Sequence, residues 1–246
     1  MDRWILSKLN TMVKNVDYNL ANYRIPEAAR ALESFVDDLS NWYVRRGRER
    51  YWVPTMTDDK IAAYMTLYHA LVITAKTAAP MIPFMAENIY QNLVCSIDKS
   101  APESIHLCDF PVVDESRIDS ALENDMDRLL NIVVLGRAAR NGSGRKNRQP
   151  LASMYVESAE GLGEEFIEII KDELNIKAVE FKSDLSEFLS YEFKPQLKTV
   201  GPKYGKQLGE IRTALAEIDG SAAKAELDDC GVLTLDLASE IGRAHV

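Results

Sequence analysis

Through the first 140 residues, apolar side chains recur at three- and four-residue steps, a spacing that predicts amphipathic helices rather than strands. The first such run covers residues 6–23, and the second begins near Pro26, which suits the first turn of a helix. Pro54 ends the second run, and Thr57 supplies an N-cap for a third. Because the links between these runs are short, an antiparallel helical bundle is predicted.

The third and fourth helices carry wide apolar surfaces, so burial on most sides of the third is expected. The apolar residues of the third are Ile61, Tyr64, Met65, Leu67, Tyr68, Leu71, Val72, Ala75 and Ala78. Pro80 and Pro83 mark the turn into the fourth helix. The residues that this helix is expected to direct inward are Ile82, Met85, Ile89, Tyr90 and Leu93. A fifth helix is predicted over about residues 120–140.

The pattern changes at residues 141–144, a Gly-rich joint. The elements predicted after it are strands at 152–156, 176–181 and 232–237, a helix at 164–174 and a helical stripe at 204–218. No structural pattern is assigned to residues 242–246. The predicted fold is therefore mainly α: residues 1–140 form an antiparallel helical bundle, and residues 141–246 form a small α/β domain. Proteases are expected to cut the joint between them.

Residues 41–52, at the end of the second helix, combine four arginines with four aromatic residues in a chain whose formal net charge is −9. Aromatic faces stack on unpaired bases, and guanidinium groups bind phosphates or base edges. This mixture is typical of a surface that recognises single-stranded RNA. The acidic balance of the whole chain argues against indiscriminate nucleic-acid binding, but it allows a local basic patch.

One face of this segment is expected to be exposed, because its members fall within about 60° of one another at ~100° per residue and point away from the apolar stripe. These residues, which we call the exposed wedge, are Asn41, Arg45, Arg48 and Trp52.

The other face continues the apolar stripe. Trp42 and Tyr43 lie close to it, which favours core positions over ligand contacts. Arg46 and Arg50 occupy positions where apolar residues would be expected, and two interpretations stay open. Either the stripe becomes a wet groove beyond the end of the bundle, or these arginines pair with carboxylates of neighbouring helices.

A second basic patch follows the fifth helix. Arg145, Lys146 and Arg148 form a glycine-flexed loop that can wrap a phosphate backbone, although a solvated basic linker explains them equally well. Arg137 and Arg140 lie near the C-terminal end of the helix, where a positive charge is favoured by the helix dipole without any ligand.

The sequence offers no catalytic or metal-binding constellation. Its three cysteines are scattered, no histidine lies at metal-ligand spacing around them, and neither a phosphate-binding Gly-rich loop nor a nucleophile elbow is present. We therefore predict no catalytic residue, metal, disulfide or cofactor. No run of ~18 apolar residues is available to span a membrane, and free thiols favour the reducing cytosol.

Four segments resemble isoleucyl-tRNA synthetases, a family of class Ia aminoacyl-tRNA synthetases: residues 2–10, 41–46, 79–87 and 145–151. The third alone indicates only class Ia. The second, Asn-Trp-Tyr-Val-Arg-Arg, and the fourth, Arg-Lys-Asn-Arg-Gln-Pro-Leu, favour the isoleucine enzyme over the valine and leucine enzymes. The resemblance runs from Asp2 to about residue 206 and implies the anticodon-binding helical domain with the region that follows it. The ATP-site signatures His-x-Gly-His and Lys-Met-Ser-Lys-Ser are absent, which implies a C-terminal fragment of a larger enzyme.

The resemblance implies that this part is not catalytic and binds the anticodon stem-loop of tRNA(Ile). The larger enzyme would be a cytoplasmic monomer whose missing catalytic domain binds ATP and Mg²⁺ and attaches isoleucine to tRNA. The missing catalytic and editing domains would be the other partners. The expected RNA-contacting residues are Asn41, Trp42, Arg45, Arg46, Arg48, Arg50, Trp52, Arg145, Lys146 and Arg148. Two alternatives remain: the same domain of a valyl- or leucyl-tRNA synthetase, or a helical scaffold whose arginines bind an acidic protein partner.

Overall fold

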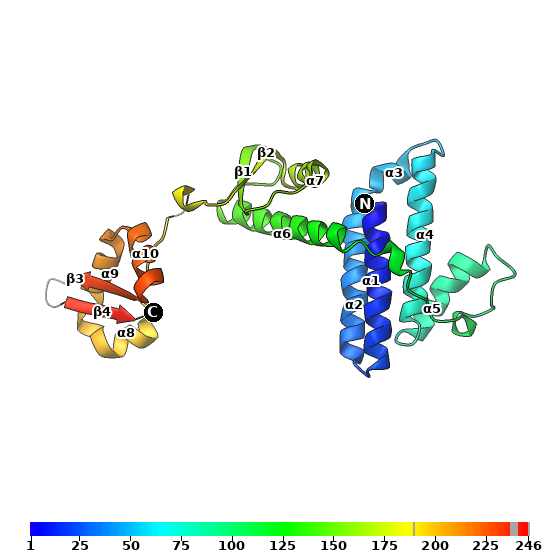
Figure 1. The fold of residues 1–246 in the computed structure, drawn as a ribbon, viewed down its shortest axis with the longest axis horizontal. Helices are drawn as coiled ribbons and strands as arrows, with labels where there is room; N and C mark the ends of the chain where they lie inside the picture. The colour runs from blue at the N-terminus through cyan, green and yellow to red at the C-terminus, as the bar shows by residue number, and fades with distance from the viewer. Residues whose placement is uncertain (189, 237–240, 246) are drawn as a thin grey trace. The chain divides into compact units, whose positions relative to one another are not determined.

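The computed structural model describes residues 1–188, 190–236 and 241–245 (Figure 1). It divides into two compact units. Unit 1 comprises Met1–Gln149 and Leu162–Leu174, and unit 2 comprises the described residues of 150–161 and 175–246. The elements of unit 1 are α1 (Asp2–Ala21), α2 (Ile25–Asp37), η1 (Asp38–Val44), α3 (Arg48–Trp52), α4 (Asp58–Ala78), α5 (Pro83–Tyr90), η2 (Gln91–Cys95), η3 (Ile105–Leu107), η4 (Glu115–Arg117), α6 (Ser120–Gly142) and α7 (Glu164–Leu174). Those of unit 2 are β1 (Leu151–Glu157), β2 (Ile176–Lys182), η5 (Ser186–Phe188), α8 (Leu197–Tyr204), η6 (Gly205–Gln207), α9 (Leu208–Glu217), α10 (Gly220–Cys230), β3 (Val232–Asp236) and β4 (Ile241–His245).

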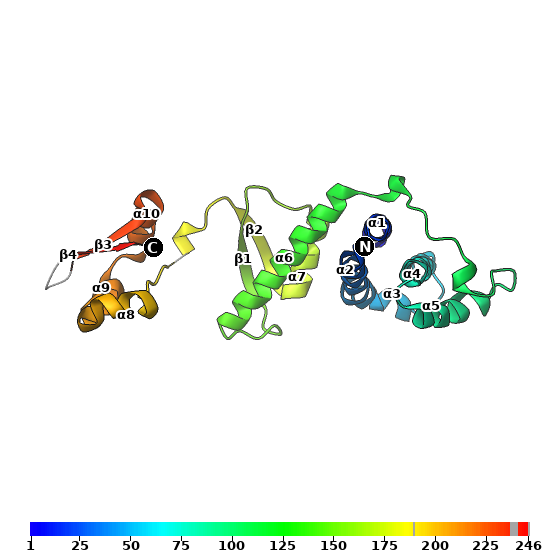
Figure 2. The ribbon, with the colours of Figure 1, turned by 90° about the horizontal axis from the view of Figure 1, so that it is seen from below.

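The predicted helical bundle is confirmed. Helices α1, α2 and α4 lie side by side in both ribbon views (Figures 1 and 2). The side chains that α1 buries lie at helical spacing and include Trp4, Ile5, Leu9, Val13 and Val16. The hydroxyl of Thr57 caps α4 by accepting a hydrogen bond from the backbone N–H of Lys60, as its sequence position predicts.

The packing of α4 differs from the sequence prediction. Its buried side is built from small residues, including Ala63, Thr66, Ala70 and Thr77, which allow a neighbouring helix to approach closely. The expectation that α4 is buried on most sides is wrong, because Ile61, Tyr64 and Met65 are exposed. Apolar periodicity alone does not tell which apolar face of a helix meets its neighbour.

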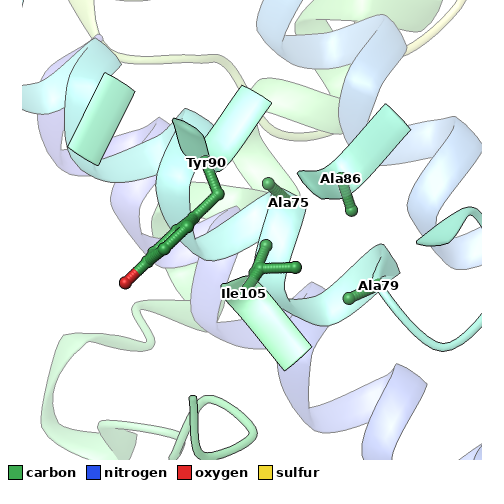
Figure 3. Packing of buried hydrophobic residues seen from close by; sticks show 5 residues of the cluster. All are labelled: Ala75, Ala79, Ala86, Tyr90 and Ile105. Atoms are coloured by element: carbon green, nitrogen blue, oxygen red, sulfur yellow. The ribbon is translucent and has the colours of Figure 1, made fainter. Parts of the chain in front are cut away.

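Helix α5 packs against the end of α4. Ala75 and Ala79 from α4 and its C-cap, Ala86 and Tyr90 from α5, and Ile105 from η3 form one buried cluster (Figure 3). The predicted inward position of Tyr90 is confirmed, and Ile89 is half-buried. The inward positions predicted for Ile82 and Met85 are wrong, since both are exposed. They lie at the start of α5, outside this cluster.

The second predicted helix is not one uninterrupted α-helix. Its α-helical part, α2, is followed by the π-helical turns of η1, and a break at Gly47 separates η1 from α3. The positions computed from ~100° per residue therefore assumed a regularity that the chain lacks. A π-helical turn has no simple sequence pattern, so its presence in η1 could not be predicted from the sequence.

Polar contacts attach α6 to the bundle. Ser7 and Thr11 on α1 both donate hydrogen bonds to the carboxylate of Glu123 on α6. Helix α7 then packs on α6, where Gly136 leaves room: a Cβ at this position would lie only 2.4 Å from Cδ1 of Leu174. The absence of a side chain at Gly136 thus leaves the space on α6 that the Leu174 side chain fills.

In unit 2, β1 pairs with β2 in parallel and β3 pairs with β4 in antiparallel register. Helices α9 and α10 bury Ile211 and Ala223 together with Leu233 and Leu235 of β3. The strands predicted at 152–156 and 176–181 and the helix at 164–174 are confirmed. Residue 237, the predicted end of the third strand, lies outside the described residues.

One expectation for this half is wrong, and two observed elements have no counterpart in the sequence prediction. The single helical stripe at 204–218 is divided among α8, η6 and α9, since the backbone of Tyr204 departs from helical geometry (φ −128°, ψ 25°). Helix α10, which starts at an Asp219 N-cap, was not expected. Residues 242–245, to which no pattern was assigned, belong to β4, whose partner strand supplies the order that its short sequence does not indicate. The division into domains at residues 140 and 141 stays a prediction.

Across the described ranges, the structure contains no helix that is both long and apolar enough to cross a membrane.

Candidate nucleic-acid interface

All four residues of the exposed wedge are exposed, as predicted. The indole of Trp52 is the most prominent, with 71% of the residue accessible. The guanidinium carbon of Arg48 lies 5.2 Å from the centre of the Trp52 ring, a cation–π arrangement that holds a flat aromatic face beside a positive charge. An aromatic face paired with an arginine in this way can stack on a base while the charge meets a phosphate.

The first half of the wedge is held more firmly. The Asn41 side-chain amide donates to a carboxylate oxygen of Asp37 at 2.9 Å, and the Asn41 carbonyl accepts a bond from Nε of Arg45 at 2.7 Å. These local bonds fix the direction of the Arg45 side chain along η1.

The two aromatic residues assigned to the core differ from each other. Tyr43 is only 1% accessible, and its hydroxyl donates to Asp2 at 2.8 Å, so the core assignment is confirmed. Trp42 is only partly buried, and Arg45 lies over its ring at 5.4 Å. The π-helical turns of η1 place Trp42 at the edge of the bundle, where its ring retains an accessible surface.

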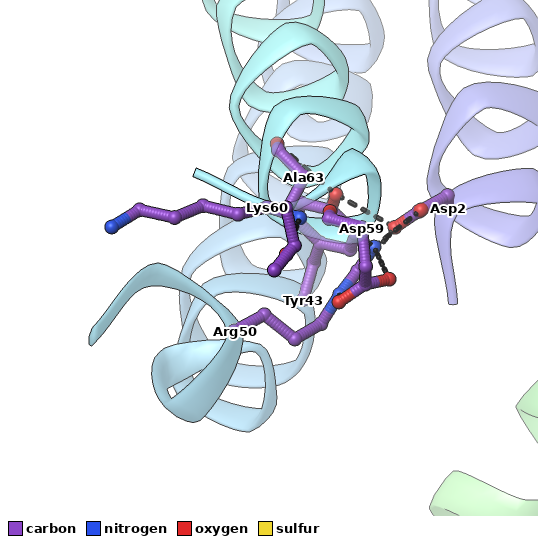
Figure 4. A network of polar contacts seen from close by, with 7 residues as sticks. Asp2, Tyr43, Arg50, Asp59, Lys60 and Ala63 are labelled. Atoms are coloured by element: carbon purple, nitrogen blue, oxygen red, sulfur yellow. Dashed lines mark hydrogen bonds and ion pairs between the residues drawn. The ribbon is translucent and has the colours of Figure 1, made fainter. Parts of the chain in front are cut away.

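Arg50 pairs with carboxylates, which supports the second of the two interpretations of its position. Its guanidinium binds both carboxylate oxygens of Asp2, at 2.7 and 2.8 Å, and also the carboxylate of Asp59 (Figure 4). The hydrogen bonds from Arg50 and Tyr43 hold the pKa of Asp2 below its ordinary value, against the opposing effect of burial. Arg50 therefore ties α3 to the first turns of α1 and α4.

Arg46 is also paired, but with a distant part of the chain. Its Nη1 donates to Glu173 on α7 at 2.8 Å, and Nη2 donates to Asp172 at 3.3 Å. Arg45 donates to the same oxygen of Glu173 at 2.7 Å, and Arg137 of α6 binds the other oxygen. One carboxylate thus joins three guanidinium groups, which we call the Glu173 cluster.

The Glu173 carboxylate stays ionised in this position. Burial pushes its pKa upward, but the hydrogen bonds from Arg45 and Arg46 outweigh that effect, so the pKa lies below the usual value of a glutamate. Its side chain is only 4% accessible, so water contributes little to its stabilisation.

The second basic patch is organised by a buried arginine. Arg140 is only 3% accessible, and it donates to the backbone carbonyls of Leu174, Lys146 and Gln149. The helix-dipole explanation therefore misses its main role, which is to fold the chain that follows α6. The side chains of Arg145, Lys146 and Arg148 are exposed on that folded loop.

The structure brings some predicted residues together and leaves others separate. Arg45 and Arg46 meet at Glu173, whereas Arg50 belongs to the Asp2 network and the basic loop is held by Arg140. The RNA contacts assigned to these residues stay predictions. Glu173 and Asp2 were not singled out from the sequence. The local sequence signal for Glu173 is its position beside the apolar Leu174 at the end of an amphipathic helix.

No group of three or more histidine, cysteine, aspartate or glutamate side chains that could hold a metal ion occurs in the part of the chain that the structure describes.

Comparison with known proteins identifies relatives of this chain. Isoleucine–tRNA ligase of Clostridium novyi is 55% identical over 219 residues, which cover 89% of this chain and 21% of the relative. The enzymes of the same name from Thermus thermophilus and Chlamydia pneumoniae are 45% and 39% identical over 87% and 96% of the chain. The chain spans about a fifth of the length of these relatives.

The family described as the anticodon-binding domain of tRNA ligase matches residues 2–156. That range contains the bundle, the exposed wedge, α6 and the basic loop, and it ends before α7. Because the match covers more than half of the chain, the protein belongs to the family of tRNA-ligase anticodon-binding domains.

Proposed function

We propose that this chain is the anticodon-binding part of an isoleucine–tRNA ligase and holds the anticodon stem-loop of tRNA(Ile). The isoleucine–tRNA ligases that it resembles support the choice of amino acid. The observation that carries the RNA contact is the exposed Trp52 ring beneath the Arg48 guanidinium, at the rim of an arginine-rich surface. Unpaired anticodon bases offer the π-faces that such a ring stacks on.

The role of this part is to hold and orient tRNA, while the chemistry takes place in other domains of the ligase. Activation of isoleucine needs ATP and Mg²⁺, and both belong to the catalytic domain of the proposed larger enzyme. This part needs no cofactor of its own. The complete ligase is proposed to work as a monomer in the cytoplasm.

A competition assay with unmodified tRNAs tests the proposal. Labelled tRNA(Ile) bound to the complete protein is challenged with unlabelled tRNA(Ile), tRNA(Val) and tRNA(Leu). Strong competition by tRNA(Ile) alone is expected. Preferred binding of tRNA(Val) or tRNA(Leu) would assign the chain to one of those ligases, and no binding of any tRNA would favour the helical scaffold for an acidic protein.

A matched pair of variants tests the surface. Trp52→Ala should weaken binding of tRNA(Ile), because one stacked base loses its platform. Phe84→Ala removes another exposed aromatic side chain, at the start of α5, and should leave the affinity unchanged. Equal losses in both variants would place the RNA surface elsewhere.

A further inference from the structure

Three arginines from two distant segments converge on one buried carboxylate. Arg45 and Arg46 directly follow η1, Arg137 comes from α6, and all three bind Glu173 of α7. Each arginine uses a single nitrogen for this contact: Nη2 of Arg45, Nη1 of Arg46 and Nη2 of Arg137. A guanidinium has five N–H donors, so these contacts engage only part of what each arginine can donate.

The charges of the Glu173 cluster do not cancel. Three guanidinium groups face one buried carboxylate and a second carboxylate, that of Asp172, which is 70% accessible and therefore well screened by water. Two of the arginine side chains, Arg45 and Arg137, are themselves 45% and 39% accessible. The cluster therefore presents positive charge to solvent from arginines that each have one guanidinium nitrogen held by Glu173.

We propose that Arg45, Arg46 and Arg137 form a binding site for phosphate groups of the tRNA backbone, with Glu173 as the residue that positions them. The inference rests on the proposed function and deepens it, because it names the chemical group that this part of the surface takes. It also adds Arg137 and α7 to a surface that the sequence assigned to residues 41–52 and 145–148.

The physical reason is pre-organisation. Long arginine side chains lose rotamer freedom when they bind a phosphate, and like charges held together repel each other. The buried carboxylate at their centre restricts the arginine rotamers and offsets their mutual repulsion before RNA binds. Gly136 supports this arrangement, because its missing side chain lets Leu174, the neighbour of Glu173, pack directly on α6.

A simpler explanation makes the opposite prediction. If Glu173 only links α7 to the bundle and RNA responds to net charge alone, removing its negative charge should tighten tRNA binding. If Glu173 positions the arginines, its loss should weaken binding although the surface becomes more positive. The sign of the change therefore separates the two explanations.

The experiment measures tRNA(Ile) affinity at several salt concentrations in the complete protein carrying Glu173→Gln. Glutamine keeps the length of the side chain, but its NH₂ group cannot accept a hydrogen bond from an arginine. We expect about a tenfold loss of affinity and a slope of log K against log salt that is shallower by about one. The matched control is Glu165→Gln, which makes the same substitution at an exposed position in the first turn of α7, outside the Glu173 cluster, and should bind tRNA at least as tightly as wild type.

Equal or tighter binding by Glu173→Gln, with an unchanged salt slope, would overturn the inference. If Glu173→Gln does not fold, Arg137→Ala decides instead, because it removes one partly exposed arm of the site while the buried carboxylate keeps Arg45 and Arg46. An unchanged affinity and salt slope in Arg137→Ala would overturn the inference in that case. Failure of the proposed function is seen separately, as wild-type protein that shows no preference for tRNA(Ile).

Discussion

Arg46 and Arg50 occupy helix positions where apolar side chains were expected, and each holds carboxylates from other elements instead. At the residue scale this arrangement follows from the shape of the guanidinium group, which can donate several hydrogen bonds in one plane. Arg50 uses two nitrogens to bind both oxygens of Asp2, whereas Arg46 shares Glu173 with two other arginines. The sequence left such pairing open, but it could not name the partners, because they lie on other helices.

Tyr43 and Trp52 should respond oppositely to truncation. Tyr43→Ala removes a buried ring and should cost about 3–5 kcal/mol of folding free energy. Trp52→Ala removes an exposed ring and should leave the melting temperature nearly unchanged while weakening tRNA binding by about 1–3 kcal/mol. Thermal unfolding and tRNA titration of both variants check this. A large loss of stability in Trp52→Ala would show that its ring packs inside the protein.

The Asp2 network should make folding stability depend on pH. Because its bonds to Arg50 and Tyr43 lower the pKa of Asp2, its contribution is fully present above the ordinary value of 3.8. That contribution is lost as the pH falls through the lower pKa of the folded state. Urea unfolding at a series of acidic pH values should show a steeper loss in wild type than in Asp2→Asn. Parallel curves would exclude a contribution from this carboxylate.

At the scale of elements, the helices could be predicted because their apolar spacing and capping residues are local properties. The N-cap at Thr57 and the strands around α7 needed no tertiary information. Which side of α4 is exposed could not be predicted. The helix carries large apolar side chains on one side and small ones on another, and only contact with a neighbouring helix decides which side is buried. The π-helical turns of η1 likewise depend on how the bundle packs around Tyr43.

Gly47 should resist replacement because of space rather than backbone conformation. A Cβ there would lie 2.9 Å from the backbone oxygen of Tyr43 and 3.3 Å from the ring of Tyr51. Gly47→Ala should therefore destabilise the protein by about 1–3 kcal/mol, measured by urea unfolding. Gly142→Ala is the matched control, because a Cβ at Gly142 meets nothing within 4 Å. Equal stability of the two variants would show that the break before α3 relaxes freely.

Arg140 should protect the basic loop from proteolysis. Arg140→Ala leaves the buried carbonyl of Leu174 without its donor, at a cost of about 1–3 kcal/mol, and releases the carbonyls of Lys146 and Gln149. Limited trypsin digestion should cut between residues 145 and 148 much faster in this variant than in wild type. Arg128→Ala, a change elsewhere on α6, serves as the control. Equal cutting rates in wild type and Arg140→Ala would restore the expectation of a freely cut joint.

At the scale of the whole molecule, the exposed wedge could be predicted while the Glu173 cluster could not. Exposure of Asn41, Arg45, Arg48 and Trp52 depends on their order along one segment. The partner of Arg46 lies 127 residues away, and no periodicity within either segment encodes that distance. Long-range ion pairs of this kind depend on the folded arrangement of several elements.

The chain by itself should catalyse no isoleucine-dependent exchange between ATP and pyrophosphate. The reason is that the sequence contains neither His-x-Gly-His nor Lys-Met-Ser-Lys-Ser, the signatures that form the nucleotide site in this class of ligase. The assay uses purified chain, with the complete ligase as positive control. Exchange above background that depends on isoleucine would show that this part carries an active site.

Unit 1 is discontinuous along the chain, because β1 intervenes between α6 and α7. A ribosome releases the chain from its N-terminus, so the helices of the bundle emerge long before α7 does. Until Glu173 has been synthesised, 127 residues after Arg46, that arginine has no such carboxylate to bind. Translation through α7, rather than through the last helix of the bundle, is therefore the event in biosynthesis that completes the arginine surface.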